Sequence, residues 1–150
     1  MDFFDTLIRY ETDLWNHLDR RLSDEGAVSL AQLEALRVVH RNAGACRVQE
    51  VSRGLSITVG AASKLVDRLE GSGLAVRTPN PEDRRSALVA LSKEGIAAHR
   101  AGEAVVERAL ADHLAGEDVS AVTRQLSGLR DRLRAEVGSA AEAATAVVTA

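Results

Sequence analysis

Cysteine, proline and long apolar runs are all scarce in this sequence. Its 150 residues include one cysteine, Cys46, so no disulfide can form within the chain and we expect a reducing compartment, the cytoplasm. No apolar run approaches the roughly 20 residues of a membrane span, so no membrane partner is expected. The acidic start, residues 1–5, differs from a secretory signal, which begins with basic residues. Both prolines lie within residues 79–81, which leaves the rest of the chain free to form helices.

Charge is distributed unevenly, although the net charge is only −3. Between Arg37 and Arg100 there are 11 Lys and Arg residues against 6 Asp and Glu, whereas the rest of the chain holds 8 against 16. A negative net charge by itself disfavours nucleic acid as a partner. Because residues 37–100 are basic, DNA binding through this segment remains a possible function.

Apolar residues recur at helical spacing over most of the chain and predict about six helices. The stripe in the first segment consists of Phe4, Leu7, Ile8, Leu14, Trp15, Leu18 and Leu22. The last segment has the alternating three-and-four spacing of a coiled-coil seam, at Val119, Val122, Leu126, Leu129 and Leu133. Candidate N-caps are Asp2, Ser29, Thr58 and Ser92. The pattern does not decide whether residues 138–150 extend the last helix.

One part of the chain has a strand pattern instead. Residues 74–78 and 87–91 alternate in the manner of strands around a polar, turn-forming segment, which predicts a β-hairpin. Two short helices joined by a tight turn at residues 55–57 precede it. The predicted fold class is therefore mainly α with a small β-hairpin wing: one domain over residues 1–150, with a winged helix-turn-helix at 29–95.

In such a module the second helix enters the DNA major groove, and its first residues reach the base edges. Its outward face has a small, partly polar front and basic residues further along. The candidate DNA contacts are Thr58, Val59, Gly60, Ala61, Ser63, Lys64 and Arg68. Only arginine among these can bind guanine with two parallel hydrogen bonds. An ordinary solvated helix face would look similar, so this helix alone does not decide the function.

The hairpin is more informative. Its candidate DNA contacts are Arg77, Asp83, Arg84 and Arg85. An exposed arginine pair at a hairpin tip suits the narrow, electronegative minor groove. Asp83 could hold Arg85 in place by a charge-assisted hydrogen bond, although surface salt bridges of this kind are common and weak.

Several segments resemble the MarR (multiple antibiotic resistance regulator) family of winged-helix transcription regulators. Residues 73–77, 80–86 and 88–95 resemble the family's wing signature, residues 63–70 the end of its recognition helix, and residues 30–36 its second helix. The resemblance implies a homodimeric regulator, usually a repressor, that binds a palindromic operator in double-stranded DNA. It also implies release of the DNA by a small anionic or phenolic ligand.

By position, the resemblance assigns roles to particular residues. Residues 58–70 become the recognition helix, Arg85 a minor-groove arginine held by Asp83, and Arg84 a contact to the DNA backbone. Residues 1–28 and 96–150 become the helical dimerisation region. Arg9, Trp15 and His40 are candidates to line an effector pocket, although Trp15 also fits the apolar stripe of the first helix.

Other chemistry has little support in the sequence. Cys46 lacks a second cysteine to resolve a sulfenate, so a small packed residue is favoured over a redox sensor. No two histidines have the spacing of a zinc site, so we expect no metal. No phosphate-binding loop or nucleophile–base set is present, so we expect neither an enzyme nor a cofactor. The remaining alternative is a winged helix that binds proteins without DNA.

Overall fold

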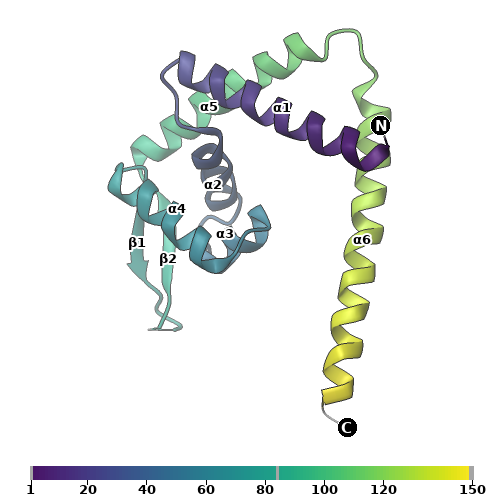
Figure 1. The fold of residues 1–150 in the computed structure, drawn as a ribbon. Coiled ribbons are helices and arrows are strands. Elements are labelled where there is room, and N and C mark those ends of the chain that lie inside the picture. The colour runs from purple at the N-terminus through teal and green to yellow at the C-terminus, as the bar shows by residue number, and fades with distance from the viewer. Residues whose placement is uncertain (1, 84, 149–150) are drawn as a thin grey trace. The chain divides into compact units, whose positions relative to one another are not determined.

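The computed structural model describes residues 2–83 and 85–148, with side chains described up to residue 136. Over these residues the order is α1 (Phe3–Asp24), α2 (Leu30–Arg41), α3 (Val48–Leu55), α4 (Val59–Gly71), β1 (Ala75–Pro79), β2 (Ala87–Leu91), α5 (Lys93–His113) and α6 (Val119–Val148) (Figure 1). This order confirms the expected winged helix-turn-helix with additional helices. The chain divides into two compact units, residues 1–111 and 112–150.

The four expected N-caps are confirmed. In each, a side-chain oxygen accepts a hydrogen bond from the backbone N–H three residues further on, at 2.9 to 3.3 Å. These caps are Asp2, Ser29, Thr58 and Ser92. Each bond satisfies one of the donors that the first turn of a helix leaves free, which is why these helices begin where the sequence indicates.

The winged helix surrounds a core of its own. Helices α2, α3 and α4 and the hairpin contribute its almost fully buried side chains, among them Leu36, Val38, Val39, Val51, Val66, Leu69 and Val89. The turn between α3 and α4 passes through Ser56, whose φ of 54° is left-handed. The Ser52 hydroxyl closes this turn by donating to the carbonyl oxygen of Ile57 at 2.6 Å. Core and turn together set the position of α4.

The hairpin is antiparallel, with Ala75 opposite Leu91 and Pro79 opposite Ala87. Strand β2 buries Val89, whereas β1 buries Ala75 and leaves Val76 45% exposed. The alternation in the sequence therefore shows two faces of β1 but does not show that the small residue faces the core. The Val89 N–H also donates to the carbonyl oxygen of Cys46 at 2.7 Å, which joins the residues before α3 to the wing.

A second core joins α1, α2 and α5 within the first unit. Its buried residues are Leu18, Leu22, Leu30, Leu33, Val105, Val106 and Ala109. Beside it, Arg37 of α2 pairs with Glu34 and Glu103, and Glu103 also lies 3.3 Å from His99. Of the α1 stripe only Leu18 and Leu22 are buried here, while Phe4, Ile8 and Trp15 stay exposed, as does Phe3.

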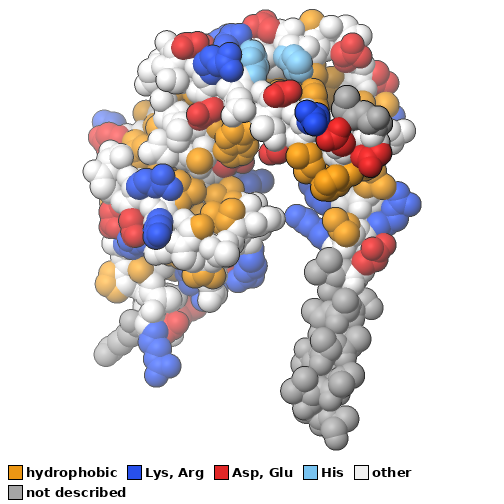
Figure 2. Space-filling view, in the orientation of Figure 1, with side chains coloured by type: hydrophobic (Ala, Val, Ile, Leu, Met, Phe, Trp, Pro, Cys, Tyr) orange, Lys and Arg blue, Asp and Glu red, His pale blue; other side chains and the backbone are white. Residues whose placement is uncertain are grey.

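In the second unit, α6 presents its expected seam to solvent. The seam residues Val119, Val122, Leu126, Leu129 and Leu133 are 38 to 61% exposed. Figure 2 shows hydrophobic side chains open along the described part of this helix. The backbone of α6 continues to Val148, so most of the segment that the sequence left undecided is helical. Among the described residues, no helix has the length and low charge needed to cross a membrane.

Candidate nucleic-acid interface

The first turn of α4 forms an open surface. Thr58, Val59, Gly60 and Ala61 are all exposed, while Ala62 begins the buried face of the helix. A Cβ atom added at Gly60 would meet nothing within 4 Å. Because no side chain in the described part of the chain covers this turn, its backbone and short side chains can approach another surface closely.

The rest of the outward face is basic. Lys64 and Arg68 are exposed, and Ser63 is half-buried between them and the front of the helix. The Arg68 Nε–H donates to the carbonyl oxygen of Lys64 at 3.4 Å, a long bond that leaves its terminal nitrogens for other partners. The helix thus combines small residues at its front with two cations behind them, the arrangement that a groove-binding helix needs.

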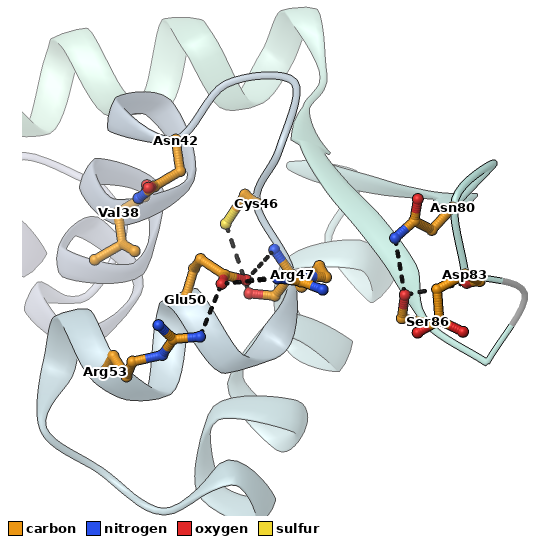
Figure 3. A network of polar contacts seen from close by, with 9 residues as sticks. All are labelled: Val38, Asn42, Cys46, Arg47, Glu50, Arg53, Asn80, Asp83 and Ser86. Atoms are coloured by element: carbon orange, nitrogen blue, oxygen red, sulfur yellow. Dashed lines mark hydrogen bonds and ion pairs between the residues drawn. The ribbon is translucent and has the colours of Figure 1, made fainter.

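The wing loop is held in shape by its own hydrogen bonds. The buried Asn80 donates from Nδ2 to the Ser86 hydroxyl at 3.0 Å and accepts from the Glu82 N–H at 3.0 Å. The Ser86 hydroxyl in turn donates to the carbonyl oxygen of Asp83 at 3.1 Å (Figure 3). An amide and a hydroxyl therefore tie the two ends of the loop together.

Asp83 contacts Arg85, but not through the side-chain hydrogen bond that the sequence suggests. Its Oδ1 accepts the backbone N–H of Arg85 at 3.0 Å, so the contact shown is to the backbone and not to the guanidinium. Arg85 itself is exposed, which leaves its side chain free to reach outward. Arg84, the other predicted contact, lies outside the described residues.

Arg77 is held by two carboxylates of α4. Its Nη1 lies 2.7 Å from Asp67 Oδ1 and 2.8 Å from Glu70 Oε2, and its side chain is only 25% exposed. With two carboxylates on one guanidinium, this arginine braces β1 against α4 and offers little charge to DNA. Its role as a DNA contact stays a prediction, and the geometry favours the bracing role.

Sequence reasoning missed a polar network at the start of α3. The carboxylate of Glu50 accepts the backbone N–H of Arg47 at 3.0 Å and lies 3.3 Å from Arg47 Nε and 3.1 Å from Arg53 Nη2 (Figure 3). Burial acts to raise the pKa of Glu50, but the hydrogen bonds from Arg47 outweigh it and hold this pKa below its ordinary value. Glu50 stands three residues after the N-cap Arg47, and this spacing was the available signal.

Cys46 lies beneath this network and is fully buried. Burial, together with the nearby Glu50 carboxylate, raises the pKa of its thiol to about 11. At neutral pH the group is therefore a protonated thiol, which reacts slowly with oxidants. Its environment is that of a packed core residue, as the sequence favours.

The candidate effector residues lie at separate places. Arg9 pairs with Asp5 in the first turns of α1, at 3.0 Å, and Trp15 is 40% exposed in the middle of that helix. His40 lies in the last turn of α2, where its ring centroid is 4.8 Å from that of His99. Among the described residues, no group of three or more His, Cys, Asp or Glu side chains could hold a metal ion.

Comparisons with known proteins agree with this geometry. The family model described as MarR family matches residues 28–86. The Multiple antibiotic resistance protein MarR of Salmonella typhimurium is 40% identical over 57 residues, which make up 38% of this chain and 40% of the relative. The match thus spans well under half the length of that curated relative.

Two solved structures extend the likeness to most of the chain. The transcriptional repressor CouR bound to a 23-mer DNA duplex has a TM-score of 0.77 at 25% identity, covering 86% of this chain and 92% of that one. CouR from Rhodococcus jostii RHA1 bound to p-coumaroyl-CoA has a TM-score of 0.75 at 25% identity, covering 86% and 90%. The sequence match over residues 28–86 and the fold shared with these structures make this chain similar to MarR-family regulators.

Proposed function

We propose that this chain is a transcriptional repressor that binds a palindromic operator in double-stranded DNA as a homodimer. The observation that carries the proposal is the open, small-residue front of α4 beside an ordered wing that presents Arg85. In this reading the residues from Thr58 to Arg68 enter the major groove, and Arg85 enters the adjacent minor groove. A regulator of this kind meets its operator in the cytoplasm.

DNA binding by a protein of this fold has a direct parallel. CouR, which shares the fold, is described as a transcriptional repressor bound to a DNA duplex. In this chain the basic residues of the outward face are set on a rigid core, so both elements can meet DNA without refolding. Phosphate contacts then supply much of the affinity and make it depend on salt.

The homodimer is supported by apolar surface that a single chain leaves open. In the first unit, Phe3, Phe4 and Ile8 are exposed on α1, and in the second unit the whole seam of α6 is exposed. Helices with an uncovered apolar stripe are stabilised by a partner helix. We assign residues 1–28 and 96–150 to the dimerisation region. A dimer also explains a palindromic operator, because the two-fold axis of the protein requires one in the DNA.

Release by a small ligand is the second part of the proposal. CouR is described bound to p-coumaroyl-CoA, which is both phenolic and anionic. We propose a ligand of this class for this chain, with Arg9, Trp15 and His40 as candidate contacts. Trp15 is the only tryptophan, so its fluorescence should change on binding. Ligands that release DNA and leave that fluorescence unchanged would argue against a contact with Trp15.

The experiment that tests the function is selection of bound duplexes from random DNA, followed by binding of the recovered sequence by wild type and Arg85→Ala. We expect a palindrome, and about ten-fold or more loss of affinity for Arg85→Ala with a smaller salt dependence. Arg108→Ala, on α5, is the matched control; once light scattering shows that it has the same oligomeric state as wild type, it should bind as wild type does. A selection that recovers no duplex would instead support a winged helix that binds protein.

A further inference from the structure

A cleft separates the start of α3 from the wing. Its volume is about 280 Å³, and Arg47, Gln49, Asp83, Arg85 and Ser86 are among the residues that line it. The backbone bond from the Val89 N–H to the carbonyl oxygen of Cys46, at 2.7 Å, holds the residue before Arg47 against β2. The two walls of the cleft are therefore fixed relative to each other, although they lie about 40 residues apart in sequence.

The charges around this cleft leave a cation without a full partner. Glu50 is one carboxylate shared by Arg47 and Arg53, so one positive charge remains after pairing. Its contacts with Arg47 Nε and Nη2 are long, 3.3 and 3.4 Å, and the Arg47 side chain is 40% exposed. On the other wall, Asp83 uses Oδ1 to bind the backbone N–H of Arg85. The cleft thus has an arginine on each wall and suits an anion.

The way a winged helix lies on DNA indicates which anion. The first helix of a helix-turn-helix crosses the sugar-phosphate backbone while the second occupies the major groove. With α4 in the major groove and the wing in the neighbouring minor groove, the strand that divides these grooves passes between the helix-turn-helix and the wing. The cleft lies between these two elements, and Figure 3 shows Arg47 between α3 and the wing strands.

We propose that this cleft binds a backbone phosphodiester of the DNA, with Arg47 as the contact and Glu50 as the carboxylate that holds the Arg47 side chain until the phosphate replaces it. The inference rests on the proposed DNA-binding function and adds a contact that neither the recognition helix nor the wing tip contains. A guanidinium matches two phosphate oxygens in the same plane, so Arg47 can exchange its long contacts with Glu50 for a paired bond to phosphate.

The test measures the affinity of Arg47→Gln for the selected operator and for an unrelated duplex over a salt series. We expect about ten-fold weaker binding to both duplexes, and a slope of log affinity against log salt that is smaller by about two, because the dimer loses one phosphate contact in each subunit. Arg108→Gln removes the same charge from α5, where Arg108 pairs with Glu25. Light scattering first has to show an unchanged dimer, and this control should then keep the wild-type slope. Arg47→Lys keeps the charge without the planar fork, so it should keep the slope and lose less affinity.

A second variant is expected to change the affinity for DNA in the opposite direction. Glu50→Gln keeps an oxygen that can accept the Arg47 N–H but removes the negative charge, so both duplexes should bind more tightly. Should Arg47→Gln prove less stable in a thermal melt, Arg47→Lys and Glu50→Gln still decide the question. Weaker binding by Glu50→Gln, or equal losses for Arg47→Gln and Arg108→Gln, would overturn the phosphate contact.

Other outcomes separate this inference from its alternatives. A loss confined to the operator would mean that Arg47 contacts a base. Calorimetric titration with inorganic phosphate at constant ionic strength should show no saturable site; a saturable site that Arg47→Gln removes would assign the cleft to a small phosphate ligand instead. Failure of the wild type to bind any duplex would refute the proposed function itself, whereas normal wild-type binding with an unaffected Arg47→Gln would refute only the cleft.

Discussion

The winged helix and the helices that flank it differ in how far their apolar residues are buried. Between α2 and β2 most large apolar side chains are buried within the chain, around Leu36, Val51 and Leu69, and Val59 and Val76 are the exposed exceptions among the described residues. On α6 every apolar seam residue is exposed, as are Phe3, Phe4 and Ile8 on α1. The first region completes its own core, whereas the flanking helices carry apolar side chains that stay exposed.

This difference separates two kinds of contribution to DNA binding. The winged helix supplies shape and cations, and these are already in place in one chain. The flanking helices would supply the pairing of two winged helices, which converts two weak contacts with DNA into one strong one. Substitutions in the two regions should therefore affect different measurements.

The largest expected effect is on the flanking region. Replacing Leu126 and Leu129 with Asp places two charges in the α6 seam, and we expect monomers in light scattering. Operator affinity should fall by about 100-fold because the two half-sites no longer bind together. The control carries Ser127→Asp and Gly128→Asp, outside the seam on the same helix, and should remain dimeric. If the seam variant stays dimeric, α6 is not part of the interface.

The second largest expected effect is on the stability of the winged helix. At Gly95 an added Cβ would lie 1.9 Å from the carbonyl oxygen of Leu74, so Gly95→Ala has to displace backbone. We expect a loss of about 3 kcal/mol in the free energy of unfolding, measured in urea. Gly60→Ala, in open space on α4, should instead gain about 1 kcal/mol. Similar values for the two variants would contradict the packing described here.

The smallest effect concerns pH. Burial lowers the pKa of His99 from 6.5; Glu103 opposes this shift, while His40, Arg37 and Arg100 add to it. The unfolded chain therefore binds a proton more readily than the folded one, so this contribution to stability is present above pH 6.5 and is lost as the pH falls below it. Urea unfolding from pH 8 to 5 should show a shallower loss for His99→Gln than for wild type. An equal or steeper loss would rule out this contribution from His99.

Much of the fold could be predicted from local pattern. The N-caps at Ser29 and Thr58 and the change from helical to strand spacing at residue 74 depend on neighbours close in sequence, and all were confirmed. The inward face of β1 could not be predicted in this way. Ala75 and Val76 are both apolar, and only packing against the helices buries Ala75.

The candidate site was predictable in its outline and not in its ion pairs. The exposed front of α4 follows from helical periodicity, because Ala62, Leu65 and Val66 share the opposite face. The partners of Arg77, by contrast, lie on the preceding helix at Asp67 and Glu70, and no local rule marks them. The cleft at Arg47 was missed for the same reason, since its other wall is the wing.

The sequence by itself determined the order of helices and strands, the helix N-caps and the location of the basic residues, because each depends on spacing along the chain. Only the tertiary structure decided which of these cations remain available. It places Arg77 between two carboxylates, leaves Arg85 exposed and sets Arg47 beside the wing. The physical reason is that a charged side chain is available to a partner only if neighbouring groups do not already pair with it. Folding brings those neighbouring groups from distant parts of the chain.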